Sequence, residues 1–322
     1  MSDDVPAATR ELLADVARRY FLEDRTKLDI ARELGVSRFK VARLLDQART
    51  TGVVTITVDG PEPEPVDEDL SARVAEHLAL DAAVVVRAGG GAAREAVGAA
   101  GARWLQRELS ADEVLGLGWG RTLTAMVESL DRLPGVAVVQ LTGTVGSDLT
   151  DSPVELVRKT AAASGGPAHP IFAPLLLPDA DTAAALRRQP DVAAVLALYD
   201  AVTTAVVAIG SWDPPGSRLR DSMAPDEREE LLRRGVQAEV AATFVDGEGT
   251  LIGADCVERC LAISAAQLRL VPRVLALAVG REESRAVRAA ACGGLVTALV
   301  ADAELAREVL TTPVVVTSSR DR

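Results

Sequence analysis

The stretch GLGWGRT at residues 116–122 combines residue types that can hold a small ligand. An apolar strand pattern precedes it and a helical pattern follows, so the positive end of a helix dipole would point at whatever binds there. Two glycines bare backbone N–H groups, and the neighbouring side chains add a hydroxyl, a positive charge and a flat ring. These candidate contacts are Gly118, Gly120, Thr122, Arg121 and Trp119. The stretch predicts a pocket for an anionic or hydroxyl-rich ligand, and a glycine turn beside a core tryptophan is the simpler alternative.

Polar loops after other apolar runs supply further candidate contacts. The loop at 142–148 offers backbone and hydroxyl donors and a carboxylate, the loop at 210–213 offers a hydroxyl and a ring, and the segment at 244–246 ends in a weaker acidic candidate. The residues are Gly143, Thr144, Asp148, Ser211, Trp212 and Asp246. Such hydroxyl and carboxylate groups suit polyol recognition, although an ordinary loop at 142–148 is equally compatible with the sequence.

The elements that must position these loops alternate along the chain from residue 82 onward. Short apolar, β-branched runs predict strands, and helical spacing fills most of the intervals between them. The predicted strands lie at 82–87, 114–118, 136–141, 170–175, 204–210, 273–280 and 295–301, and the predicted helices at 92–109, 121–130, 153–164, 179–188 and 282–291. Strands that are apolar on both faces indicate a doubly wound, mostly parallel, Rossmann-like α/β sheet covered on both sides. Ligands bind such sheets beyond the carboxyl ends of the strands, where the candidate loops lie.

A basic island near the N-terminus, DIARELGVSRFKVARLL at 29–45, contrasts with the rest of this acidic chain, whose net charge is −12. Residues 25–49 hold seven basic and three acidic residues, a balance of +4, whereas residues 59–322 hold 25 basic and 38 acidic residues, a balance of −13. Only this segment can approach a polyanion without strong repulsion.

The island has the local signals of a helix-turn-helix. Thr26 is a plausible N-cap for a helix at 27–34, Gly35 permits a left-handed turn, and Ser37 can cap a third helix at 38–49. A wing strand is predicted at 51–58, and an amphipathic helical hairpin is the simpler alternative. The expected contacts with double-stranded DNA come from Thr26, Lys27, Ser37, Arg38, Lys40 and Arg43.

The overall composition sets limits on domains, compartment and cofactors. A chain of 322 residues is long enough for more than one domain. The acidic, proline-rich stretch DGPEPEPVDED at 59–69 predicts a linker between a domain at 1–58 and a domain at 70–322. The longest apolar runs are too short to span a bilayer and no signal peptide is recognisable, so we expect a cytoplasmic protein without a membrane partner.

The cysteines and histidines do not form a metal-ligand pattern. The three cysteines are odd in number, and the only histidines, His77 and His169, belong to different segments. We therefore expect ordinary thiols, no metal and no cofactor, with a redox pair of Cys256 and Cys260 as the alternative.

These motifs resemble those of SorC-type bacterial transcriptional regulators over nearly the whole chain. The N-terminal match consists of Ile30-Ala31, Leu34-Gly35, Ser37-Arg38, Val41, Arg43-Leu44-Leu45, Ala48-Arg49 and Gly52-Val53. The matches in the large part are GLGWGRT, 140–143, 173–175, 209–211, 244–246 and 293–294. The resemblance implies an N-terminal winged helix-turn-helix and a C-terminal sugar-binding domain that also oligomerises.

The resemblance also shows one departure. Members of the family commonly bind a phosphorylated sugar with a lysine at the position that Glu283 occupies here. Two like unit charges about 4 Å apart, at an effective dielectric near 20, repel by roughly 4 kcal/mol. We therefore predict that the effector is not bound as a phosphomonoester in the family's usual pose, unless Arg121 or Arg281 supplies the lost charge.

The sequence thus predicts a transcriptional regulator that binds operator DNA, responds to a small carbohydrate effector and acts as a homodimer or homotetramer. A sugar-converting enzyme is the main alternative, because the implied fold is similar to that of sugar-phosphate isomerases and CoA transferases. The candidate acids Asp148, Asp213, Asp246 and Glu239 are scattered, however, and form no paired motif. A purely structural DNA-associated protein is a third alternative.

Overall fold

The computed structural model describes residues 7–21, 23, 25–51, 53–54, 66–88, 90–145 and 152–315. The chain divides into two compact units, Met1–Glu62 and Pro63–Arg322. The described part of the second unit begins at Val66, which bridges Val86, and Asp67 caps the first helix of this unit. Residues 66–69, predicted as the end of the linker, therefore belong to the large unit.

The N-terminal unit is built from α1 (Ala7–Phe21), α2 (Lys27–Glu33) and α3 (Arg38–Thr50). The hydroxyl of Thr26 accepts a hydrogen bond from the Asp29 N–H at 3.2 Å and so caps α2. Gly35 adopts a φ of +64° in the turn, as predicted, and the Ser37 hydroxyl accepts from the Lys40 N–H at 3.2 Å. The core of this unit consists of Leu13, Val16, Ala17, Ile30, Ala31, Val41, Leu44, Leu45 and Ala48.

The predicted wing lies almost entirely outside the described residues. Only Thr51, Val53 and Val54 of the stretch 51–58 are described, and they form no strand. Val53 and Val54 pack against the helical core instead, and the Val54 N–H donates to the Ala48 carbonyl at 2.9 Å.

The large unit contains a seven-stranded parallel sheet in the order β1-β11-β10-β5-β2-β3-β4. The chain runs from β2 outward to β3 and β4, then returns to β5 and runs outward in the opposite direction to β10 and β11. The topological switch point therefore lies between β2 and β5, where a doubly wound sheet offers a binding crevice. The strands are β1 (Ala82–Val86), β2 (Val114–Leu117), β3 (Ala137–Gln140), β4 (Ala168–His169), β5 (Thr204–Ala208), β10 (Arg273–Ala278) and β11 (Ala298–Asp302).

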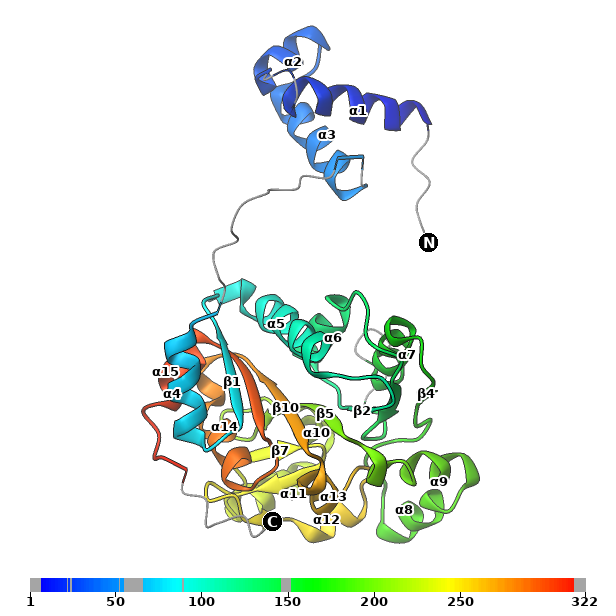
Figure 1. Cartoon of the computed structure of the whole chain (residues 1–322), viewed down its shortest axis with the longest axis vertical. Coiled ribbons are helices and arrows are strands. Elements are labelled where there is room, and N and C mark those ends of the chain that lie inside the picture. The colour runs from blue at the N-terminus through cyan, green and yellow to red at the C-terminus, as the bar shows by residue number, and fades with distance from the viewer. Residues whose placement is uncertain are drawn as a thin grey trace. The chain divides into compact units, whose positions relative to one another are not determined.

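Helices cover both faces of this sheet (Figure 1), because successive strand residues are apolar and point to opposite sides. In β1, for example, Val85 packs in one core cluster and Val86 in the other. One face is covered by α5 (Ala93–Glu108), α6 (Arg121–Glu128) and α7 (Pro153–Ser164). The other is covered by α4 (Glu68–Leu78), α8 (Ala180–Arg187), α9 (Pro190–Leu196), α13 (Ala265–Leu270), α14 (Ser284–Cys292) and α15 (Ala303–Val309).

A second, antiparallel sheet is inserted between β5 and β10. It has the order β6-β7-β8-β9, with β6 (Gly210–Ser211), β7 (Ala238–Val240), β8 (Thr243–Val245) and β9 (Leu251–Ile252). The short helices α10 (Arg218–Ser222), α11 (Pro225–Arg233) and α12 (Ala254–Glu258) accompany it. The sequence did not predict this insertion, because strands of two or three residues are too short to show a period.

One predicted strand is wrong. Residues 170–175 form no strand, and β4 is a two-residue strand that ends at His169. Pro170 and Pro174 lack the N–H that a sheet ladder needs, and the segment makes only an isolated bridge between Thr144 and Pro174. No helix in the described part of the chain is both long and apolar enough to cross a membrane.

Candidate functional site

A pocket of about 360 Å³ opens at the carboxyl ends of β2 and β5, on the topological switch point. It is lined by the loop that follows β2, by Val207 to Gly210 at the end of β5 and just beyond it, and by residues from α5, α10, β7, the end of β10 and the segment after it. The sequence placed a pocket at the first of these loops. The parallel sheet explains why the segment after β5 and the segment after β10 also reach this pocket, because the carboxyl ends of all its strands lie at the same edge.

The glycine loop forms part of the pocket wall, but the Gly118 N–H that the sequence indicated as a ligand donor is already used within the sheet. The Gly118 N–H donates to the Val206 carbonyl at 2.8 Å, and a Cβ at Gly118 would lie 3.1 Å from that oxygen. Gly120 has a φ of +148° and a ψ of 160°, a conformation essentially confined to glycine. The helix α6 begins immediately afterwards, and its first N–H groups have no partner within the helix. Arg121 and Thr122 both line the pocket, so the helix start faces a bound ligand.

Three arginines line the pocket, of which the sequence had indicated only Arg121. Arg94 comes from the first turn of α5 and Arg218 from the start of α10. The guanidinium carbon of Arg218 lies 5.9 Å from the centre of the Trp119 ring. Arg281, the other arginine considered from the sequence, is exposed and does not line this pocket. The pocket therefore brings three arginines together with three acidic residues, Asp221, Glu239 and Glu283.

Two carboxyl groups in the pocket have altered acidity. Burial raises the pKa of Glu283 to about 8; nearby Glu282 and Asp302 also raise it, whereas Arg121 lowers it. The Val279 N–H donates to the Glu283 carboxyl at 3.3 Å. At pH 7 a carboxyl whose pKa is one unit higher is roughly 90% protonated. Glu283 is therefore mostly neutral in the pocket, which removes most of the charge repulsion that the sequence predicts.

The second carboxyl, Glu239, belongs to the wall of the pocket. Burial raises its pKa, and it accepts hydrogen bonds from the Ala242 N–H at 2.7 Å and from the Ser217 hydroxyl at 3.0 Å. These bonds tie the β7–β8 turn to the loop before α10, so both oxygens of Glu239 are already occupied by the fold.

Thr142 lines the pocket; it belongs to the loop at 142–148 that the sequence indicated, but it was not among the contacts expected from that loop. Its hydroxyl is buried and has no hydrogen-bond partner among the described residues, and its side chain lines the pocket. A buried hydroxyl without a partner is costly, which suggests that a bound ligand completes its hydrogen bonding. Its position could have indicated a ligand contact, because Thr142 comes directly after the strand pattern at 136–141. The neighbouring Gly143 was named as the contact instead.

The structure places Ser211 and Trp212, which the sequence indicated as ligand contacts, outside the lining of this pocket. Trp212 is completely buried, packs edge-on against Phe244 with ring centres 5.4 Å apart, and does not line the pocket. The Ser211 side chain is buried in β6 and also lies outside the pocket lining. The inserted sheet turns both side chains into its own core, which the pattern of a strand end followed by polar residues did not reveal.

The loop at 142–148 and Asp246 also differ from expectation. A Cβ on Gly143 would lie 2.6 Å from the Pro174 carbonyl oxygen, and the Thr144 hydroxyl donates to the Ala173 carbonyl at 3.2 Å. Both residues serve packing against 173–175 rather than lining the pocket. Asp246 accepts from the Glu248 and Thr250 N–H groups, each at 2.9 Å, and so holds a turn outside the pocket. Asp148 lies outside the described residues.

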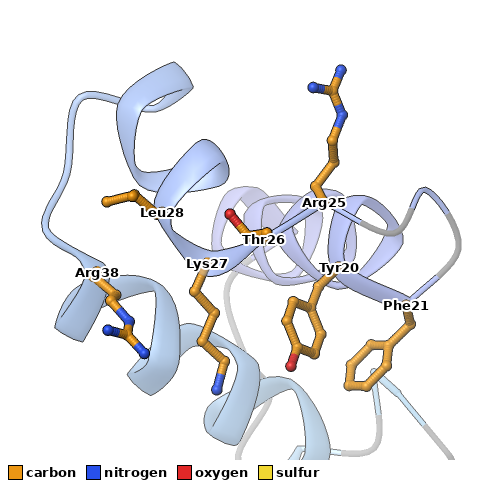
Figure 2. A pocket seen from close by; sticks show the side chains of 7 residues that line it. All are labelled: Tyr20, Phe21, Arg25, Thr26, Lys27, Leu28 and Arg38. Atoms are coloured by element: carbon orange, nitrogen blue, oxygen red, sulfur yellow. The ribbon is translucent and has the colours of Figure 1, made fainter.

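Three cationic residues of the N-terminal unit, Arg25, Lys27 and Arg38, line a hollow at the junction of its helices. Figure 2 shows a hollow whose wall combines Thr26 and Lys27 from the start of α2 with Arg38 from the start of α3 and the rings of Tyr20 and Phe21. Arg25 points away from Lys27 and Arg38 in this view, and it pairs with Glu33 at 3.2 Å.

The predicted DNA contacts in this unit are available to different degrees. Arg38, Lys40 and Arg43 are exposed, and none of them forms an ion pair with any residue that the structure describes. The Lys27 ammonium lies 5.3 Å from the centre of the Tyr20 ring. The Thr26 hydroxyl donates to the Asp29 carboxylate at 2.6 Å, so its proton is already used and a phosphate would have to displace that bond.

Comparisons with known proteins identify the family. The family model described as "Putative sugar-binding domain" matches residues 66–311. The chain is 27% identical over 318 residues to the sorbitol operon regulator of Klebsiella pneumoniae, covering 96% of this chain and 99% of that one. The chain belongs to the SorC family of transcriptional regulators.

Two further likenesses extend this assignment across both units. The crystal structure of full-length SorC from Klebsiella pneumoniae superposes with a TM-score of 0.72 at 26% identity, covering 95% of this chain and all of that one. The erythritol catabolism regulatory protein EryD of Brucella abortus is 28% identical over 301 residues, or 91% of this chain and 94% of that protein. The pocket described above lies within the segment that the sugar-binding family model matches.

Proposed function

We propose that this SorC-family chain binds operator DNA through residues 1–58 and senses a small carbohydrate through the pocket at the β2–β5 switch point. The observation that carries the proposal is the convergence, at one sheet edge, of a glycine loop, a helix start, an unpartnered hydroxyl and three arginines. Effector binding changes the affinity for the operator. The protein acts in the cytoplasm and needs no cofactor or membrane partner.

The effector in this proposal is an anionic, hydroxyl-rich molecule. Arg121, Arg94 and the start of α6 supply positive charge, and Trp119, held beside Arg218, supplies a flat surface for a sugar ring. The anionic group contacts these arginines and not the position of Glu283. Arg121 supplies the charge that the missing lysine would have provided, so a phosphate is compatible with the pocket despite the presence of Glu283.

DNA binding requires more than one copy of the chain. Four cations, Lys27, Arg38, Lys40 and Arg43, give one N-terminal unit a modest electrostatic affinity. Two or four copies joined through the large units would multiply this affinity on a repeated site. We therefore propose a homodimer or homotetramer, in which the effector shifts the population of subunit arrangements.

Catalysis is the function that the pocket supports less well. Three carboxyls line the pocket, Asp221, Glu239 and Glu283. Glu239 already accepts two hydrogen bonds from the fold, and Asp221 pairs with Arg220 at 3.6 Å. A general acid or base needs a free oxygen within reach of the substrate. Incubating the chain with sugars and sugar phosphates and analysing the products tests this, and we expect binding without turnover.

The experiment that tests the proposed function combines DNA binding with a ligand panel. Duplex from upstream of the chain's own gene is titrated in a gel-shift assay with matched pairs of sugars, polyols and their phosphates. The double reversal Arg38→Glu with Lys40→Glu should abolish the shift. The control reversal Arg103→Glu with Arg132→Glu changes the net charge equally on exposed residues of the large unit and should leave the shift intact. Unchanged binding by the first variant would refute the proposal.

A further inference from the structure

Phe39 is the most exposed large apolar side chain that the structure describes, at 84% of its surface. It occupies the first turn of α3, directly after Arg38 and directly before Lys40, both exposed. Aromatic rings usually bury most of their surface. A ring left in water between two cations is therefore placed where a partner would cover it.

The helical period puts this ring at the centre of the outward face of α3. The core residues Val41, Leu44, Leu45 and Ala48 define the inward stripe. Successive helical residues are rotated by roughly 100°, so Phe39 and Arg43, four residues apart, lie together on the side opposite that stripe. The surface that α3 presents is therefore an aromatic ring surrounded by Arg38, Lys40 and Arg43.

This combination fits the major groove of DNA better than a protein surface. The cations can reach phosphates and base edges, as nucleic-acid contacts require. Among the base edges exposed in the major groove, thymine alone presents an apolar group, its C5 methyl, and phenylalanine is one of the side chains that contact it.

We propose that Phe39 is a specificity-determining residue that packs against the C5 methyl of a thymine in the operator. This inference rests on the proposed function, in which α3 enters the major groove. Arg38 and Lys40 position the helix on the duplex, and Phe39 makes binding depend on thymine at one base pair in each half-site.

Replacing thymine by deoxyuridine tests this directly, because the substitution removes only the methyl group and preserves base pairing. Sites are first selected from a random duplex pool with the full-length chain, and each thymine is then replaced singly. Burial of a methyl-sized group contributes about 0.8 kcal/mol, so a single replacement should weaken binding by the wild-type chain about fourfold. Phe39→Ala should weaken binding to the thymine site and should no longer respond to deoxyuridine there, whereas Phe39→Leu should keep part of the response.

The chain offers a matched control in Phe172, which is 81% exposed in the large unit. Phe172→Ala should bind like the wild type and keep the full deoxyuridine effect. Both rings are exposed, so neither truncation removes a core contact, and circular dichroism checks that each variant is folded.

The outcomes separate this inference from the proposed function. Suppose that the wild type selects a site, but every deoxyuridine replacement changes the affinity of the wild type and of Phe39→Ala by the same factor. The inference is then overturned, while the proposed DNA binding stands. The same holds if Phe39→Ala changes only the oligomeric state, because the ring would then contact protein. If no site is selected at all, or if the Arg38→Glu and Lys40→Glu reversal binds normally, the proposed function fails and the inference fails with it.

Discussion

At the scale of single residues, the ionisation of Glu283 decides what the pocket can accept. A fully charged carboxylate would exclude a phosphate, but burial holds this carboxyl mostly protonated at pH 7. Its neighbours are Glu282 and Asp302, which raise its pKa, and Arg121, which lowers it. The sequence showed the lysine-to-glutamate departure, whereas the protonation state depends on burial and could not be predicted from residue type.

The first prediction concerns pH. The pKa of Glu283 lies above its ordinary value, so the neutral form persists up to about pH 8 and is lost as pH rises further. An anionic effector favours the neutral form, and its affinity should therefore fall by about tenfold between about pH 7.5 and about pH 9.5. Glu283→Gln should remove this fall and leave the affinity near pH 7 almost unchanged. Isothermal titration with a sugar phosphate measures the affinity of the wild type and of the variant at each pH. An equally steep fall of affinity in the variant would contradict this role of Glu283.

The second prediction concerns Gly120. Its φ of +148° is unfavourable for any residue with a Cβ, and that atom would lie 3.1 Å from the Ala208 Cβ. Gly120→Ala should cost about 1 to 3 kcal/mol in the free energy of unfolding of the large unit, or weaken effector binding if the loop moves instead. Gly91→Ala is the control, because no atom lies within 4 Å of the added Cβ. Denaturant unfolding and effector titration give the free energy of unfolding and the effector affinity of both variants. Equal values for Gly120→Ala and Gly91→Ala would show that the Gly120 conformation is not needed.

At the scale of elements, the accuracy of the sequence predictions followed the strength of the local signals. The caps at Thr26 and Ser37, the turn at Gly35 and the strands β1, β2, β3, β5 and β10 were predicted from patterns of neighbouring residues. The inserted sheet β6–β9 was not, because its short strands pair with one another through contacts that no periodicity records. For the same reason Trp212 resembled a pocket residue although it belongs to the core of that insertion.

The third prediction tests a cap. The Thr26 hydroxyl accepts from the Asp29 N–H at 3.2 Å, and Thr26→Ala leaves this donor without its partner. The change should lower the stability of the N-terminal unit by about 1 kcal/mol. Thr26→Ser keeps the hydroxyl and should restore most of the stability. Hydrogen exchange of the α2 amides reports on this unit alone, and equal protection in the alanine variant would show that the cap contributes nothing.

At the scale of the whole molecule, charge separates the two tasks. The basic face of α3 belongs to a small unit, and the large unit carries the acidic excess while concentrating arginines in one pocket. The sequence predicted this division and the loop that carries much of the pocket. It did not identify Arg94 or Arg218, which come from segments that only the sheet order brings to the same edge.

The fourth prediction is a salt dependence. Each phosphate that a cation neutralises adds about −0.9 to the slope of log K against log salt concentration. Lys40→Gln removes one cation from each N-terminal unit, so a dimer should lose a slope of about 1.8 and a tetramer twice as much. Binding isotherms over a range of potassium chloride concentrations, combined with the mass of the complex in solution, provide both numbers. A slope unaffected by the substitution would mean that Lys40 does not contact the DNA backbone.

The most direct test of the account is the operator affinity of the full-length chain measured by fluorescence anisotropy with and without a sugar phosphate that binds it. We expect the ligand to change the affinity of the wild type by at least about fivefold. Arg121→Glu should abolish this response while leaving the affinity without ligand unchanged, because the reversed charge lies in the pocket and not on α3. If the Arg121→Glu variant still responded to the ligand as fully as the wild type, the pocket at the β2–β5 switch point would not be the sensor.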